Sequence, residues 1–407
     1  MVLLYNKDMR KFLIPLLTIL ILGGAAWGIS YYSQDESIDG GVINQPTDNN
    51  NNNDNNGQPG QSVNTTGLNL SIPNGFSIET FAKNLSGARV IEFDGFGNMW
   101  VSQTSAGQIS TLELENGKVK RQNAVFRNLR QPHGLAFEDS NKNLLYFVEN
   151  HQVTRVALYS DDRGQKILDL PSGGGHFTRT LLIKDGKLYI SAGSSCNVCR
   201  ESDNRRATIM QSNLDGSGFK IYATGLRNSV FMAIRPQDGK MWATENGRDN
   251  LGDNIPPDEI NIIEEGRNYG WPTCFGKNIH DDNFDKNVYI RNPCMEPYEA
   301  GSHIDIQAHS ATLGLAFIPD SWPAEYRGDL LVALHGSWNR TVPTGYKIIR
   351  VKLDANGNSE GIEDFISGWH TGRAVLGRPV DVKFDKDGNL FVSDDRAGVI
   401  YRVWPVK

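Results

Sequence analysis

The sequence lacks any excess of basic charge and any of the common nucleotide-binding motifs. Its 41 Lys and Arg residues are outnumbered by 47 Asp and Glu residues, which gives a net charge of -6. Nucleic-acid-binding domains usually carry a basic surface, so this balance argues against such a partner. No nucleophile elbow, P-loop or dinucleotide fingerprint is present, because the glycine run 173–175 precedes an expected strand and opens no helix.

One long apolar run stands near the N-terminus. Three basic residues precede the uncharged residues 12–34, whose apolar core is long enough to cross a bilayer. We expect a cytoplasmic segment at 1–11, a transmembrane anchor at 12–32 and the remainder outside, in the periplasm or at the cell surface. A cleaved signal peptide is the alternative, but this run is longer than a typical signal core.

Residues 33–66 are almost free of large apolar side chains and include an Asn-rich tract. Such a segment cannot bury enough surface to offset its ordering entropy, so we predict a disordered linker between the anchor and a folded domain at 67–407.

Cysteine is scarce, with four residues in the whole chain: Cys196, Cys199, Cys274 and Cys294. The C-x-x-C and the distant pair resemble a zinc site, but zinc sites are usually compact and this chain is expected outside the cytoplasm. We predict disulfides, with Cys274–Cys294 as the leading pair; zinc binding and redox chemistry of the C-x-x-C are the alternatives.

A pattern of apolar residues, a turn with Asp, Gly or Asn, and an alternating strand recurs along the chain. Its six copies begin at Phe93, Phe137, Ile183, Arg235, Phe317 and Phe384. Each copy is typical of a β-hairpin, and no amphipathic helix of convincing length interrupts them. Repeats of roughly 45 residues with several short strands are typical of propeller blades. The predicted fold is therefore an all-β, six-bladed β-propeller.

The spacing of the copies widens twice, so we expect long excursions at residues 266–304 and 335–373. We also expect the ring to close by pairing of a strand at 76–81 with a strand at 399–404.

A His or Arg precedes the apolar strand of five consecutive repeats. These residues are His133, His176, Arg227 with its neighbour Asn228, His309 and Arg378. A single His beside a strand is more often structural, but equivalent positions in successive blades predict one polar site at a mouth of the channel. A neutral His can remove a proton from a hydroxyl, and guanidinium groups bind carboxylates. The segment 224–272 adds carboxylates and free carbonyls that suit a polyanion held with a hard cation.

Several segments resemble the pyrroloquinoline quinone (PQQ)-dependent soluble aldose dehydrogenases, especially the glucose/sorbosone branch. They are GGGHFTRTLLI, GLRN with TENGRDNLGDNIPPDEIN and NYGWP, LVALHGSWNRTVPTGYK, and GRPVDVKFDKDGNLFVSDDRAGVIYRV. The resemblance covers about residues 75–404, the whole predicted propeller. It implies oxidation of a sugar or related aldehyde by hydride transfer to PQQ, with a Ca²⁺ ion as Lewis acid.

The resemblance also implies roles for individual residues. His176 matches the general base, and Arg227 matches the arginine that polarises the quinone oxygen. The backbone carbonyls of Gly247 and Arg248 match the calcium ligands. Further cofactor contacts are implied at Asn228, Arg378 and Asp395.

Departures from the family pattern concern substrate choice more than cofactor class. Val230 and Val380 replace a glutamine and a second arginine, and Gly175 replaces an acidic residue beside the base. The cofactor-binding lysine has no clear counterpart. Its candidate replacements are His335 and Arg340, with Arg396 as a further positive charge, and His133 stands where a sugar-contacting residue is expected.

Two other functions remain open on the sequence. Other six-bladed propellers hydrolyse sugar lactones with calcium, but they normally use several carboxylates on the metal, whereas this rim carries His and Arg. A non-catalytic propeller that binds a polysaccharide or a protein is the second. The expected partners are a sugar or aldehyde, an unidentified electron acceptor and the membrane.

Overall fold

The computed structural model describes residues 62–138, 141–158, 160–161, 163–297 and 299–406. The predicted segments 1–11 and 12–32 and most of the linker 33–66 lie outside this part of the chain. Among the described residues, none of the helices has the length and apolar content needed to cross a membrane.

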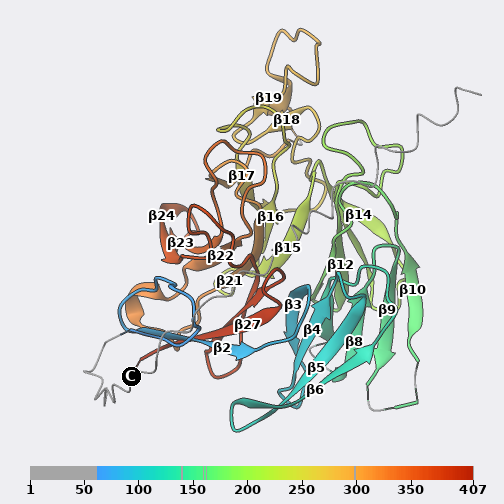
Figure 1. Ribbon diagram of the computed structural model, residues 1–407. Helices are drawn as coiled ribbons and strands as arrows, with labels where there is room; N and C mark the ends of the chain where they lie inside the picture. The colour runs from blue at the N-terminus through green and yellow to red at the C-terminus, as the bar shows by residue number, and fades with distance from the viewer. Residues whose placement is uncertain (1–61, 139–140, 159, 162, 298, 407) are drawn as a thin grey trace, which may run out of the picture. The chain divides into compact units, whose positions relative to one another are not determined.

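Six antiparallel sheets are arranged as blades around one axis (Figure 1), which confirms the predicted all-β propeller. Blades 1 to 3 contain β3(Ala88–Phe93), β4(Met99–Gln103), β5(Gln108–Glu115), β6(Lys118–Phe126); β7(Leu135–Glu138), β8(Asn141–Val148), β9(Gln152–Ala157), β10(Gln165–Asp169); and β11(Arg179–Lys184), β12(Lys187–Ala192), β13(Thr208–Asn213), β14(Lys220–Thr224). Blades 4 to 6 contain β15(Ser229–Ile234), β16(Met241–Glu245), β17(Asp258–Ile263), β20(Ile304–Ile306); β21(Thr312–Phe317), β22(Leu330–Leu334), β23(Lys347–Leu353), β24(Ser359–Ile366); and β25(Pro379–Phe384), β26(Leu390–Asp394), β27(Val399–Pro405), β2(Phe76–Ala82).

The innermost strands form a closed ring. In order these are β3, β7, β11, β15, β21 and β25, each in contact with the next, and β25 is again in contact with β3. The second strands β4, β16, β22 and β26 are buried at every position because neighbouring blades cover both of their faces. The outer strand β6 is instead mostly exposed.

All six predicted hairpins are confirmed, and they occupy the same place in every blade. Each is the turn between the first and second strand, as in the pairings Phe93↔Met99, Ile183↔Leu188 and Phe384↔Leu390. The sequence pattern therefore marks one turn per blade at the same end of the ring.

Ring closure also follows the prediction. Strand β2 pairs antiparallel with β27, from Phe76↔Pro405 to Ala82↔Ile400. One boundary was wrong: Val63–Asn64, which the sequence placed in the linker, form strand β1 and pair parallel with β2. Backbone pairing to the ring thus begins before residue 67.

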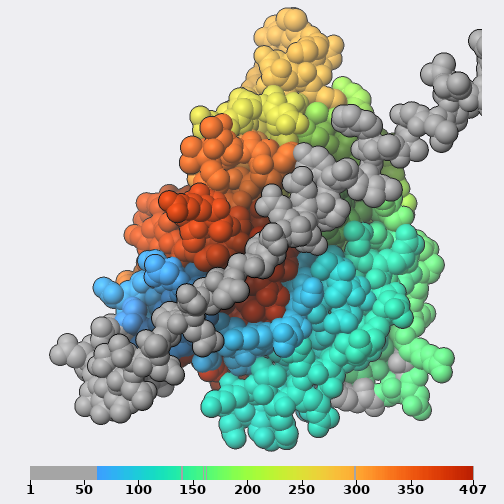
Figure 2. Space-filling model, viewed as in Figure 1, coloured from blue at the N-terminus to red at the C-terminus, as the bar shows by residue number. Residues whose placement is uncertain are grey.

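Of the two predicted excursions, the first is confirmed and the second is wrong. Residues 266–303 connect β17 to β20, carry β18(Cys274–Phe275), β19(Ile279–His280) and η1(Pro293–Met295), and project beyond the blades (Figures 1 and 2). Residues 335–373 instead contain the third and fourth strands of blade 5, β23 and β24. Residues 349–353 alternate between apolar and basic side chains, as expected of a strand.

Both predicted disulfides are present, so the zinc alternative does not apply to these sulfurs. Cys274–Cys294 closes the projecting excursion, and Cys196–Cys199 lies in the connection between β12 and β13.

Candidate active site

Two kinds of segment meet at one end of the channel: those leading into the innermost strands, and the loops joining second to third strands. They lie at the same end because paired strands are antiparallel. Successive blades contribute polar residues that form two hydrogen-bonded groups, which we together call the network: the first runs from His176 to Asn339, and the second joins His335, Asp395 and Arg89. From blade 3 to blade 6 and on to blade 1, its members are His176, Ser194, Asn197, Arg227, Asp249, Asn339, His335, Asp395 and Arg89.

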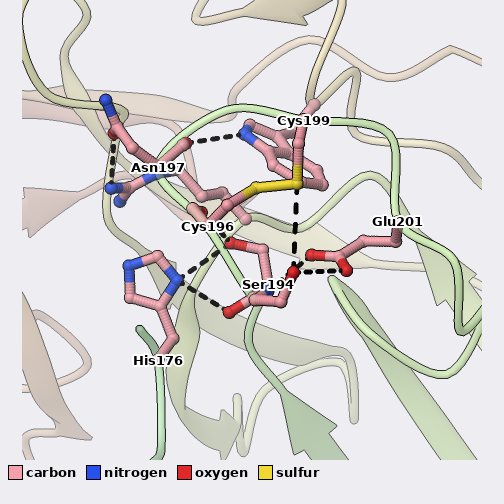
Figure 3. Close-up of a disulfide and its surroundings, with 9 residues drawn as sticks. His176, Ser194, Cys196, Asn197, Cys199 and Glu201 are labelled. Atoms are coloured by element: carbon pink, nitrogen blue, oxygen red, sulfur yellow. Dashed lines mark hydrogen bonds between the residues drawn. A yellow bond between two sulfur atoms is a disulfide. The ribbon is translucent and has the colours of Figure 1, made fainter. Parts of the chain in front are cut away.

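His176 precedes β11, and Ser194 fixes the orientation of its ring (Figure 3). Nδ1 lies 3.1 Å from the Ser194 carbonyl oxygen and 2.9 Å from Ser194 Oγ. The carbonyl can only accept, and the Ser194 hydroxyl already donates to the Cys196 carbonyl at 2.7 Å. The proton of the neutral ring is therefore on Nδ1, and the lone pair is on Nε2. Nε2 makes no hydrogen bond within the described residues.

The surroundings of His176 keep the ring neutral. Burial, with the nearby positive charge of Arg227, lowers the pKa of His176 to about 3. A ring with this pKa carries its lone pair at every physiological pH. Any anionic group bound nearby would raise the pKa, since it would favour the protonated form.

Arg227 lies beside His176 and is 4% exposed. Its five N–H groups all donate within the protein. They bind Asn197 O (2.8 Å), Asn246 O (3.1 Å), Gly247 O (2.8 Å), Asn197 Oδ1 (2.9 Å) and Asp249 Oδ2 (2.9 Å). A hydrogen bond from Arg227 to a bound quinone would require one of these bonds to be exchanged, whereas its charge acts without any rearrangement.

The neighbours Asn228, Gly247 and Arg248 lie around Arg227. A Cβ placed on Gly193 would stand 2.7 Å from both Asn228 Oδ1 and His176 Cβ, so these two side chains flank one glycine. Asn228 Oδ1 is buried and has no hydrogen-bond partner among the described residues. Arg248 pairs with Asp281 at 2.7 Å. A cavity of about 20 Å³, enough for a single water, adjoins Arg227 and Gly247.

Blades 5, 6 and 1 form the second half of the network. Asp395 binds His335 Nε2 at 2.9 Å and Arg89 Nη1 at 2.7 Å. Although burial raises it, the pKa of Asp395 is held well below its usual value by His335 and Arg89. Arg378 donates to the Gly336 carbonyl at 2.9 Å and lies 4.8 Å from the Tyr346 ring centroid.

The remaining predicted residues differ in position. Arg340 donates to the Ala308 carbonyl at 3.2 Å and to Asp253 O, and His309 binds Gly252 O at 2.9 Å, so both brace the loop after β16. Arg396 is exposed and donates to Val375 O. His133 is 0% exposed and its Nε2 has no partner among the described residues, so contact with a sugar would require its surroundings to move. The assigned roles stay predictions.

Sequence reasoning missed three members of the network: Arg89, Asn197 and Asp249. Arg89 is the second residue of β3, whereas the His and Arg residues of the other blades precede their inner strands, so the repeat pattern does not include it. Asn197 stands between the two cysteines of the C-x-x-C motif, and no pattern in the sequence singles it out. Asp249 follows the predicted calcium ligands in the acidic loop, whose carboxylates were predicted only as a group and not residue by residue.

A cavity larger than the one beside Arg227 lies elsewhere. It has a volume of about 660 Å³ and is lined by Lys240, Arg267, Lys277, Glu299, His303 and neighbouring residues at the outer edge of blade 4. None of the network residues lines it.

The ring of six blades and its axial His–Arg network define a propeller of the class that includes the PQQ-dependent sugar dehydrogenases. Within that class the chain belongs to the TrAA12-like family, whose model matches residues 70–405. The resemblance to the PQQ-dependent aldose dehydrogenases is thereby confirmed at the level of the family, and the glucose/sorbosone branch stays a prediction.

Relatives and solved structures agree with this assignment. An uncharacterized protein of Borreliella burgdorferi is 32% identical over 82% of this chain and 90% of its own length. A PQQ-dependent pyranose dehydrogenase of Coprinopsis cinerea is 23% identical over 82% of this chain, but the match spans only 54% of that enzyme. The structure of its PQQ domain has a TM-score of 0.73 at 21% identity, covering 84% of this chain and 99% of the domain. The apo aldose sugar dehydrogenase of Escherichia coli gives a TM-score of 0.61 at 18% identity.

Proposed function

We propose that this protein oxidises a sugar, an aldose or a related aldehyde, with PQQ and Ca²⁺ as cofactors. The observation that carries the proposal is the pairing of a neutral His176, whose Nε2 lone pair is left open by the Ser194 contacts, with the adjacent Arg227 guanidinium. The relatives described as PQQ-dependent pyranose and sugar dehydrogenases, and as a quinoprotein glucose dehydrogenase, support the same class of reaction.

The residues present fit an anionic quinone and a hard cation. Arg227, Arg378, Arg340 and Arg89 supply positive charge around the network, which suits a ligand that carries carboxylates. Asn228 Oδ1 and His133 Nε2 are buried polar atoms without partners among the described residues, as expected where a polar ligand or water completes the bonding. The Gly247 carbonyl accepts one bond from Arg227 and, having a second lone pair, can also bind a cation.

The residues of the chain would act as follows. Nε2 of His176 accepts the proton of the sugar hydroxyl, while Nδ1–H stays bonded to Ser194 and keeps the ring in position. Arg227 places positive charge beside the reacting centre and stabilises the negative charge that develops there. The carbonyls of Gly247 and Arg248 hold Ca²⁺, and Asn228, Arg378 and Asp395 contact the cofactor. When bound, PQQ supplies the two-electron acceptor.

Localisation and electron transfer belong to the same proposal. An anchor at residues 12–32, outside the described part of the chain, would hold the propeller at the outer face of a membrane. The electrons would then pass to an acceptor at that membrane or to a soluble carrier.

Reconstitution tests the proposed function directly. The full-length protein, purified in detergent and stripped with EDTA, is mixed with PQQ and Ca²⁺, and the quinone absorbance is followed while aldoses are added. We expect reduction of the quinone only when sugar, PQQ and Ca²⁺ are all present. Exhaustive chelation should abolish reconstitution, and Ca²⁺ should restore it.

Two results would contradict the proposal. Sugar oxidation that survives exhaustive chelation would show that the reaction does not need Ca²⁺. Hydrolysis of sugar lactones without PQQ, and no quinone reduction with any sugar, would instead identify a calcium lactonase.

A further inference from the structure

A short loop after β12 contacts both of the residues to which the proposed function assigns the chemistry. We name Ser194–Cys199 the clamp loop. Its first residue binds His176 through Ser194 O and Ser194 Oγ (Figure 3). Ser194 N also donates to the Arg227 carbonyl at 2.7 Å. The start of the loop is therefore bonded to His176 on one side and to the Arg227 backbone on the other.

The middle of the clamp loop holds the Arg227 side chain. Asn197 O accepts from Nε at 2.8 Å, and Asn197 Oδ1 accepts from Nη2 at 2.9 Å. Asn197 also fixes the next partner of Arg227, because Oδ1 accepts from Asp249 N at 2.8 Å and Nδ2 donates to Asp249 O at 3.1 Å. One side chain thus sets the position of the guanidinium and of the carboxylate paired with it.

The disulfide closes this loop around Asn197. Cys196 and Cys199 flank Asn197 and Val198, and their bond ties the two ends of the turn together. The Cys196 carbonyl is the acceptor that takes the Ser194 hydroxyl proton at 2.7 Å. If Cys196 moves, the Ser194 hydroxyl becomes free to donate to Nδ1, which favours the tautomer with its proton on Nε2. The Ser194 carbonyl still accepts from Nδ1–H, so the ring would divide between the two tautomers and the lone pair would face the site in only part of the molecules.

The clamp disulfide is also the more accessible of the two in the protein. Cys196 and Cys199 are partly exposed, whereas Cys274 and Cys294 are 8% and 1% exposed. A soluble dithiol can therefore reach the clamp disulfide in the folded protein while the second disulfide stays protected.

We propose that the clamp loop, closed by Cys196–Cys199, is the positioning element that sets both the His176 tautomer and the Arg227 orientation, and that reduction of this disulfide switches the site off. The effect of the His176 tautomer and of the Arg227 orientation on catalysis rests on the proposed function. In the reduction, a dithiol attacks the disulfide, is itself oxidised to a cyclic disulfide, and leaves Cys196 and Cys199 as thiols, so that two electrons and two protons are transferred.

The first test needs neither cofactor nor activity. Long-range ¹H–¹⁵N NMR correlations of ¹⁵N-histidine report the tautomer of each His in the full-length apoprotein, and His176→Gln assigns the His176 signals. We expect Nδ1–H in the wild type, and a mixture with Nε2–H in the Cys196→Ser/Cys199→Ser variant. The Cys274→Ser/Cys294→Ser variant is the matched control and should keep the wild-type His176 signals.

Unchanged His176 signals in the clamp variant would overturn the proposal. If that variant does not fold, the wild type treated with a dithiol under native conditions gives the same comparison, with mass spectrometry to confirm that only Cys196–Cys199 is reduced. If the dithiol reduces Cys196–Cys199 and the His176 signals do not change, the proposal is likewise overturned.

The second test uses the cofactor-loaded enzyme. Misplacement of a reacting group by about 1 Å costs on the order of 100-fold in rate, so we expect the dithiol to lower kcat by about 10- to 100-fold with little change in KM. Reoxidation should restore kcat, and the Cys196→Ser/Cys199→Ser variant should be slow and insensitive to the dithiol. Full activity after reduction would overturn the proposal. Lack of any turnover in the wild type would contradict the proposed function alone, because the tautomer test does not depend on it.

Discussion

His176 shows how one backbone segment can decide the chemistry of a side chain. Both contacts of Nδ1 come from Ser194, and burial beside Arg227 keeps the ring neutral by lowering its pKa to about 3. A base with so low a pKa has a lone pair but little driving force for proton transfer. The anionic cofactor of the proposed function would supply the missing driving force by raising the pKa.

Replacement of His176 tests its role at the residue scale. In His176→Ala the proton acceptor is lost while Arg227, Arg378 and the Gly247 carbonyl remain, so PQQ binding should be retained. We expect turnover to fall on the order of 100-fold or more, measured as quinone reduction by sugar, with PQQ affinity followed in parallel by absorbance titration. Near-normal turnover would show that another group removes the proton.

At the residue scale the sequence predicts positions better than partners. The rule that a His or Arg precedes each inner strand finds residues that the fold brings to one end of the channel, but it does not reach Arg89, which is the second residue of β3. It says nothing of Asn197, because the bonds to Arg227 depend on a loop conformation without a sequence pattern. It also did not show that every N–H of Arg227 is already used within the protein.

Individual blades pack against one another through backbone as much as through side chains. Gly314 in β21 faces the inner strand of blade 6, and a Cβ at this position would lie 2.6 Å from Asp381 Cα and 2.7 Å from Val380 O. A Cβ placed on Gly134, just before β7, would likewise lie 2.6 Å from Leu181 N of blade 3. Inner strands therefore come close enough that a single methyl group has no room.

Gly314→Ala measures this packing at the element scale. Because the neighbouring atoms are backbone, blades 5 and 6 must separate, and we expect a loss of about 1–3 kcal/mol in the free energy of unfolding, seen as a lower thermal midpoint. Gly175→Ala is the matched control for stability, since its Cβ would meet only Ser195 O at 3.7 Å. Equal midpoints for the two variants would show that the strands move apart without cost.

The elements that were predicted correctly are those with strong local patterns. Each inner hairpin has a Gly- or Asn-containing turn between apolar runs, and all six were placed correctly. The outer strands of blade 5 were missed because the first strands of this blade are followed by an irregular loop from His335 to Tyr346. The short alternation at residues 349–353 follows this long irregular segment, so it did not stand out as a strand.

At the scale of the whole molecule, the ring is closed by the pairing of β2 with β27, and we call this strand pair the seam. Blade 6 takes three strands from the C-terminal end of the chain and its outer strand β2 from the N-terminal end. Ile78 in β2 is 0% exposed and packs in a core cluster with residues of blades 5 and 6, including Trp322, Phe365 and Val403. No other blade combines strands from both ends of the described chain.

Ile78→Ala weakens this seam. The lost burial and the cavity should lower the free energy of unfolding by about 2–5 kcal/mol, while Val125→Ala, at a 43% exposed position of β6, should change it little. Hydrogen exchange should then increase in blades 1 and 6 and also in blade 3, because a closed ring loses order together. Faster exchange confined to β2 would show that the ring persists without its closure.

The place of β2 in the chain decides how a pulling force on the N-terminal side would act on the propeller. Strand β2 is the first long strand of the described chain, and it is paired along its length with β27. A force applied to the chain before Ser62 reaches the ring through β1 and β2. It therefore acts on the β2–β27 strand pair before it acts on any other blade. This one strand pair would set the force at which the ring opens. In the sequence it is far from His176 and Arg227, the residues assigned to catalysis.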